Sequence, residues 1–268
     1  MKTIVIPTDF SENSMKAFEF TNDFFTGDNF NYFVTTVYDI PHGGTSSLFS
    51  LMEQLRKQAI EEMEAFMGVL KERFPAIHKT AESAVLQGSF TDQIIGLVNE
   101  KKADFIVMGT KGATGMKEVL LGSNASNLVN DTTSPVFAIP QEYERENVRS
   151  ILLSYDGKTL TENTISIVGV LSRAFKLPIN LFHVRKKADQ PIQNWGEIEN
   201  RFNNHHISLY EAFADTFEEG LKSEIADLNS LLVLVSRKKS FWNRLMKGSQ
   251  SKKALMHFHL PMLVLPEK

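Results

Sequence analysis

The chain has 268 residues, of which 42% are hydrophobic and 23% are charged, and its net charge is −3; this composition is typical of globular proteins and gives no general attraction to nucleic acid or to an anionic membrane. The absence of cysteine excludes disulfides, zinc–thiolate sites and a cysteine nucleophile. The apolar run before Pro7 is too short for a signal peptide, and no run reaches the roughly 18 apolar residues of a membrane span. We therefore expect a cytoplasmic protein without a membrane span.

Apolar and β-branched runs alternate with amphipathic segments through the first half of the chain. Strands are predicted over residues 3–7, 32–38, 79–87, 104–109 and 135–140, and helices over residues 11–25, 47–74, 90–101 and 123–131. This strict alternation predicts an α/β fold, in which a doubly wound parallel sheet is covered by helices on both faces.

The second half of the chain repeats the first. The matched residues are Asp9 with Asp156, Val37 with Val184, Met108 with Val235, and Gly122-Ser123 with Gly248-Ser249. The first two pairs share one offset, and the last two have an offset about twenty residues shorter, so a duplicated domain with one central deletion explains the series. We predict two tandem domains over residues 1–141 and 149–268, joined by the polar segment QEYERENVR that begins at Gln141.

A glycine-rich segment follows the predicted strand 104–109. Its spacing of Gly109, two residues, Gly112, nine residues and then Gly122-Ser123 fits neither the Rossmann fingerprint nor a Walker A loop. Such glycines let backbone N–H groups face an anion, and the helix that starts at Gly122-Ser123 favours phosphate through its free N–H groups and its dipole. Ser123 would either cap that helix or donate its hydroxyl to a phosphate oxygen. The alternative is a glycine-rich loop that binds nothing.

Three features should meet at one edge of the first sheet. Asp9 follows the first predicted strand, Val37 ends the second, and the glycine-rich segment follows the fourth. In open parallel sheets, ligands bind beyond the carboxyl ends of the strands, where the strand order reverses. We therefore expect the candidate site at this edge.

These motifs resemble those of tandem universal stress proteins. The family's nucleotide-binding members carry G-x2-G-x9-G-[ST], which the glycines above match. The family's first strand is matched by Pro7-Thr8-Asp9-Phe10-Ser11, and its closing strand by Pro135-Val136. The resemblance covers nearly all of the chain. It implies two adenine nucleotide α-hydrolase-like domains related by an internal pseudo-twofold axis, with ATP, with or without Mg²⁺, as the ligand.

The resemblance also implies the residues that would bind ATP in the first domain. Those at the adenine and ribose end would be Pro7, Thr8, Asp9 and Val37, with Met108 against the base or the sugar. Those at the phosphates would be Gly109, Gly112, Gly122, Ser123 and Asn124. In the second domain Ser236 and Lys239 replace the first two glycines. Their side chains would crowd a phosphate, so we expect no ordinary ATP site there, although Asp156 and Val184 remain at its base end.

The glycine-rich segment has no candidate general base nearby, and its donors would bind phosphate equally in ground and transition states. The favoured function is a stress-response or regulatory protein that binds an adenine nucleotide with slow or no hydrolysis, without a catalytic residue or a protein metal site. Two other functions stay open. One is an ATP-using adenylating enzyme of similar layout, whose SGGxDS motif is missing from PTDFSENS. The other is a scaffold with empty sites that binds an unidentified protein partner.

The resemblance implies that the two halves pair through their last strands, PVFAIP and PMLVLP. Both are short and apolar, and an uncovered apolar edge strand promotes aggregation. The linker holds the halves at high effective concentration. We expect Val136 to Ile139 to lie against Met262 to Leu265 as a pseudo-dimer within one chain, and a homodimer with each edge on another chain is the alternative.

Overall fold

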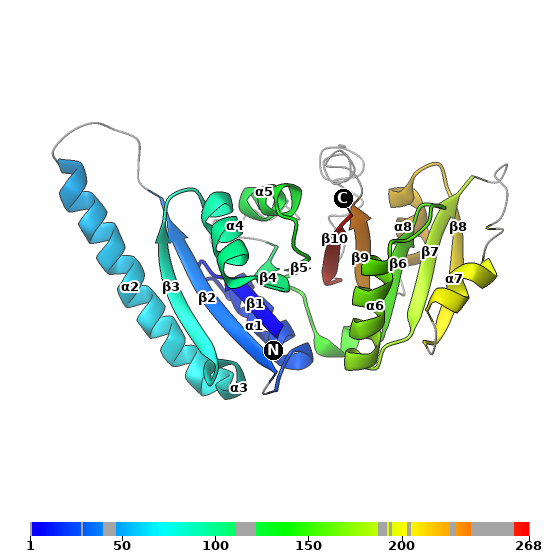
Figure 1. Ribbon diagram of the computed structural model, residues 1–268. Coiled ribbons are helices and arrows are strands. Elements are labelled where there is room, and N and C mark those ends of the chain that lie inside the picture. The colour runs from blue at the N-terminus through cyan, green and yellow to red at the C-terminus, as the bar shows by residue number, and fades with distance from the viewer. Residues whose placement is uncertain are drawn as a thin grey trace. The chain divides into compact units, whose positions relative to one another are not determined.

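The computed structural model divides into two compact units, Met1–Gln141 and Glu142–Lys268 (Figure 1). It describes residues 2–27, 29–39, 47–110, 122–186, 192, 195–202, 205–225, 229–236 and 260–267. None of the helices in these ranges combines the length and the apolar character that a membrane crossing requires.

The first unit alternates strands and helices in the predicted order. Its elements are β1 (Lys2–Pro7), α1 (Glu12–Phe24), β2 (Phe30–Tyr38), α2 (Ser47–Arg73), α3 (Pro75–His78), β3 (Ala81–Gln87), α4 (Phe90–Lys101), β4 (Phe105–Gly109), α5 (Ser123–Asp131) and β5 (Val136–Ile139). The strand order is β3-β2-β1-β4-β5, and each neighbouring pair is parallel. The predicted doubly wound α/β fold is confirmed.

The order of the strands reverses between β1 and β4. From β1 the chain moves to β2 and β3 on one side, and β4 and β5 then extend the sheet on the other. Because crossovers between parallel strands are right-handed, α1 and α2 cover one face and α4 and α5 cover the other (Figure 1). This arrangement brings the carboxyl ends of β1, β2 and β4 to one edge of the sheet.

Local sequence sets the ends of the helices. Ser11 is the N-cap of α1, and its side chain accepts a hydrogen bond from the backbone of Ser14. The predicted helix 47–74 instead ends at Arg73, and the short α3 follows. Pro75 explains the break, because a proline disfavours the helical conformation of the residue before it. Phe74 accordingly has φ −134° and ψ 62°.

Aromatic rings form much of the core between α1 and the sheet. Phe137 on β5 lies 5.2 Å from Phe20, 5.3 Å from Phe25 and 5.6 Å from Phe105, measured between ring centroids. Such pairs add to the free energy gained from burial alone. The cluster therefore ties α1 to β4 and β5 and holds the loop that follows β1.

Tyr32 on β2 is a buried residue whose hydroxyl donates to the carbonyl of Phe25, just after α1. Burial raises the pKa of Tyr32 from 10.0 to about 12. Tyr32→Phe leaves that carbonyl without this donor, so we expect a loss of about 1–3 kcal/mol in the free energy of unfolding at neutral pH. Denaturant titration monitored by circular dichroism measures it.

Tyr32→Phe should also change how the free energy of unfolding falls at alkaline pH. Unfolded tyrosine ionises near pH 10 and folded Tyr32 near pH 12, so the stability from the protonated hydroxyl is lost as pH rises through this window. Tyr32→Phe should flatten the loss. Tyr38→Phe is the control, since its hydroxyl bonds Gln87 at an exposed position. Equal losses of unfolding free energy in the two variants would show that the buried Tyr32 hydroxyl contributes no more to stability than the exposed one.

The second unit repeats the topology of the first. Its elements are η1 (Arg145–Asn147), β6 (Ser150–Tyr155), α6 (Glu162–Phe175), β7 (Ile179–Arg185), α7 (Trp195–Arg201), β8 (Ile207–Phe213), α8 (Phe217–Ile225), β9 (Ser230–Ser236) and β10 (Met262–Pro266). Within this unit the strand order is β10-β9-β6-β7-β8, again parallel. Between β7 and β8 the 7-residue α7 stands where the first unit has the 27-residue α2, which is where the offset of the repeat shortens.

Candidate functional site

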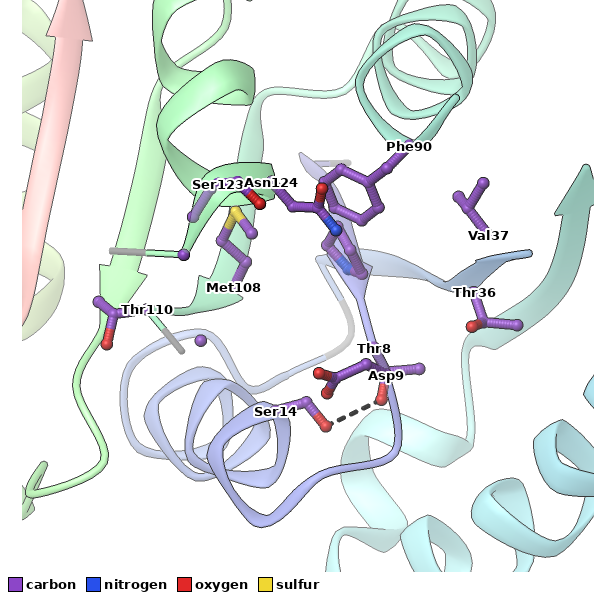
Figure 2. A pocket seen from close by; sticks show the side chains of 14 residues that line it. Thr8, Asp9, Ser14, Thr36, Val37, Phe90, Met108, Thr110, Ser123 and Asn124 are labelled. Carbon is purple, nitrogen blue, oxygen red and sulfur yellow. Dashed lines mark hydrogen bonds between the residues drawn. The ribbon is translucent and has the colours of Figure 1, made fainter. Parts of the chain in front are cut away.

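A pocket lies at the edge of the first unit where the strand order reverses. The pocket is open to solvent and has a cavity volume of about 190 Å³. The residues that line it are Pro7, Thr8, Asp9, Ser14, Thr36, Val37, Phe90, Met108, Gly109, Thr110, Gly122, Ser123, Asn124 and Ala125. Figure 2 shows Ser123 and Asn124 on one side and Thr36 and Val37 on the other.

The structure brings nine of the ten predicted site residues to this one pocket. The tenth, Gly112, lies outside the described residues. Sequence reasoning missed five lining residues: Ser14, Thr36, Phe90, Thr110 and Ala125. Thr36, Thr110 and Ala125 directly adjoin predicted positions and could have been included. Phe90 had a weaker signal, since it begins a helix that follows a strand at the same edge of the sheet.

The loop after β1 is held by a chain of hydroxyl groups. The Ser14 hydroxyl donates to the Ser11 carbonyl at 2.8 Å, so the Thr8 hydroxyl is the donor in its 2.9 Å bond to Ser14 (Figure 2). Thr8 Oγ1 in turn accepts the Phe10 N–H at 3.0 Å. Because each hydroxyl has one proton, Thr8 already uses its own to hold the loop, and its role at the pocket is to position its neighbours.

Phe10 has φ 62°, in the left-handed region, which costs a non-glycine residue about 1–3 kcal/mol. Its ring packs on Phe66 of α2 at 5.4 Å, an edge contact that offsets part of this cost. The turn presents Asp9 at the pocket, exposed to solvent. Asp9 Oδ1 accepts the Ser11 hydroxyl at 2.5 Å and the Ser11 N–H at 3.2 Å, so the carboxylate has a fixed orientation.

The structure shows why position 109 requires glycine, which the sequence did not reveal. A Cβ at this position would lie 2.3 Å from Asn13 Nδ2 and 2.6 Å from the Asn13 carbonyl oxygen. The close approach that needs glycine here is therefore that of α1 to the end of β4. Along β4 the N–H groups of Ile106 and Thr110 donate to β5. Because donors alternate along a strand, the Gly109 N–H points toward the β1 side, where the pocket lies.

The start of α5 supplies backbone donors. Gly122 is the N-cap, Ser123 is the first helical residue, and no described side chain caps the helix. Of the two roles considered for Ser123, capping is thus wrong. Gly122 donates its N–H to the Thr110 carbonyl at 2.7 Å, which fixes the helix start beside β4. The next three residues line the pocket and carry first-turn N–H groups without intrahelical acceptors.

A family model described as the universal stress protein family matches residues 1–140. The chain belongs to the universal stress protein family. Two curated family members from Methanocaldococcus jannaschii are similar to it. Universal stress protein MJ0531 is 31% identical over 144 residues, which cover 52% of this chain and 81% of that protein. Universal stress protein MJ0577 is 24% identical over 155 residues, which cover 53% and 96%.

Solved structures extend the likeness to both units. A universal stress protein from Archaeoglobus fulgidus superposes with a TM-score of 0.75 over 99% of this chain and 98% of that chain, at 19% identity. A functionally unknown protein from Pseudomonas aeruginosa, PA1789, gives 0.56 over 99% and 92%, at 13% identity. At these identities the likeness concerns the fold, which is that of a tandem universal stress protein.

The second unit of this universal stress protein has different side chains and contacts at the repeated positions of the base end. Tyr155 takes the position of Thr8 in the repeat and is buried, with its ring 5.6 Å from that of His183. Val184, the counterpart of Val37, packs on α8, since a Cβ on Gly220 would lie 2.7 Å from a Val184 methyl group. Asp156 remains exposed. Lys239 and Gly248-Ser249 lie outside the described residues.

Within the described residues, no three His, Asp or Glu side chains gather in a way that could hold a metal ion. Asp9 is the sole titratable side chain among the described residues that line the pocket. The lining of the pocket therefore combines backbone donors, apolar side chains and one carboxylate.

Proposed function

We propose that the first unit binds an adenine nucleotide, ATP, and that this cytoplasmic protein has a regulatory role with slow or no hydrolysis. The observation that carries the proposal is the convergence of nine motif residues on one pocket at the reversal of strand order. Ligands of doubly wound sheets bind at this place. Membership of the universal stress protein family agrees with the proposal.

The chemistry of the lining residues fits the parts of a nucleotide. The uncapped first turn of α5, with Ser123 and Asn124, presents N–H groups and the positive end of the helix dipole to phosphate. Val37 and Met108 offer apolar surface to a base. Asp9 lines the pocket, and a carboxylate is a group that accepts hydrogen bonds from ribose hydroxyls.

The residues that line the pocket also support slow turnover. Phosphoryl transfer to water needs a group that positions or deprotonates the nucleophile, in addition to donors on the phosphates. Among the described lining residues Asp9 is the one acidic or basic side chain, and the Ser11 hydroxyl donates a hydrogen bond to its Oδ1. Donors that hold phosphate equally in the ground and transition states give affinity without rate.

Ser123→Asp tests the phosphate end of the site. A carboxylate at the first position of α5 favours the helix dipole, so the free protein should not lose stability. The same charge repels a nucleotide phosphate, and we expect ATP affinity to fall about tenfold or more. Isothermal titration calorimetry measures the affinity.

Ser123→Asn is the matched control, since it has the shape of aspartate without its charge, and it should bind ATP much more tightly than the aspartate variant. Adenosine should bind both variants equally, because it has no phosphate. Equal ATP affinity of the two variants would place the phosphates elsewhere. Wild-type protein that binds no adenine nucleotide would contradict the proposed function as a whole.

A further inference from the structure

Phe90 is a pocket residue that no motif of the family resemblance contains. It is the first residue of α4, after the N-cap Ser89. The turn before it is fixed, because Gly88 has φ 126° and donates its N–H to the Tyr38 carbonyl at 3.0 Å. The end of β2 thereby holds the start of α4 beside Val37, and Figure 2 shows the Phe90 ring at the pocket.

The ring of Phe90 is only half-buried and lines the pocket. Phe10 and Phe18 each pack on Phe66 at 5.4 Å, whereas Phe90 has no aromatic partner within the described ranges. An apolar face at a cavity gains free energy when a ligand removes it from water. A planar aromatic ligand would add the favourable geometry of ring stacking.

In the second unit, the residue at the position of Phe90 has an aromatic contact with a strand of the sheet. Phe217 is the counterpart of Phe90 and likewise begins its helix, α8. Its ring packs edge-on against Phe182 of β7, with centroids 5.7 Å apart. Three residues on, Gly220 lets α8 contact Val184. In the second unit the helix start therefore closes onto the strand.

The first unit has different residues at the two positions through which α8 packs on β7 in the second unit. Thr35 stands where the repeat places Phe182, and Gln93 stands where it places Gly220. Thr35 is fully buried, and its hydroxyl has no hydrogen-bond partner among the residues that the structure describes. Threonine has no ring, so this strand position gives Phe90 no aromatic contact of the kind that Phe182 gives Phe217. The ring faces the pocket that Val37 and Met108 also line.

We propose that Phe90 is the stacking face for the base of the bound nucleotide and sets the preference of the site for ligands with an aromatic base. This inference rests on the proposed function. Stacking of a base on an aromatic side chain is worth about 1–3 kcal/mol in proteins that bind single-stranded nucleic acid, and it tolerates different bases. The ring thus selects nucleotides over simple polyphosphates, while α5 holds the phosphates.

The experiment uses the full chain with Phe90→Leu, which keeps an apolar side chain but removes the ring, and Phe90→Tyr, which keeps it. We expect Phe90→Leu to weaken ATP and AMP about tenfold and Phe90→Tyr to stay within about twofold of wild type. Inorganic tripolyphosphate has no base, so its affinity should be the same in all three proteins. In NMR spectra the adenine protons should show ring-current shifts with wild type that disappear with Phe90→Leu.

The failures of this inference and of the proposed function are distinguishable. If wild type binds ATP and Phe90→Leu binds it equally, with unchanged shifts of the adenine protons, the stacking role is wrong and the nucleotide site stands. A parallel loss of tripolyphosphate affinity would also overturn the role, since it would mean that the substitution distorts the whole pocket. If wild type binds no adenine nucleotide, both the proposed function and this inference are wrong.

Discussion

Phe137→Ala is expected to destabilise the first unit by about 3–5 kcal/mol, the usual cost of removing a large ring from a core. Phe137 is buried on β5 and contacts three other rings, those of Phe20, Phe25 and Phe105. These rings lie on α1, at its C-cap and on β4, so the cavity left behind has rigid walls and cannot collapse easily. Since native domains are stable by only about 5–15 kcal/mol, the loss should shift the unfolding midpoint of this unit markedly.

Phe213→Ala is the matched control. Phe213 lies on β8, is 53% exposed and has the guanidinium of Arg185 4.5 Å from its ring centroid. An exposed cation–π contact is worth about 0.5–1 kcal/mol, so the control should lose no more than that. Guanidinium titration, with amide hydrogen exchange to assign each transition to a unit, measures both variants. Similar losses would mean that the aromatic cluster does not anchor the first unit.

Gly109→Ala is expected to destabilise the first unit by several kcal/mol, as overpacking commonly costs about 1–3 kcal/mol and a backbone clash costs more. The new Cβ would meet both the side chain and the carbonyl oxygen of Asn13, at 2.3 and 2.6 Å. The side chain can rotate away, but the carbonyl belongs to α1 and moves only with the helix. Displacing α1 from β4 would also disturb the loop after β1, so ATP affinity should fall with stability.

Gly96→Ala provides the control for this glycine. Gly96 lies inside α4, and a Cβ there would have nothing within 4 Å. Alanine is the better helix former, so this variant should gain about 0.5–1 kcal/mol. The double variant Gly109→Ala with Asn13→Ala should recover only part of the loss, since the carbonyl clash remains. Full recovery in thermal unfolding would show that side-chain crowding alone requires the glycine.

Secondary structure and the place of the site were largely readable from the sequence. The helix predicted over residues 90–101 is α4, Phe90–Lys101, at both ends. Apolar periodicity and capping residues are local properties, so a short window contains them. The motif positions fell on one pocket because parallel strands place their carboxyl ends at one edge. Pro75 directly follows the helix predicted over residues 47–74, close to the observed end of α2 at Arg73.

Which residue meets which neighbour was decided only by the folded chain. Gly109 needs no side chain because Asn13 of another element approaches it. Phe90 lines a pocket and Phe217 packs against Phe182, whose place on the strand of the first unit is taken by Thr35. These contacts join segments that are far apart in the chain. Periodicity describes the burial of a residue, but it does not describe the partner across the contact, and that partner determines whether a ring fills a core or faces a ligand.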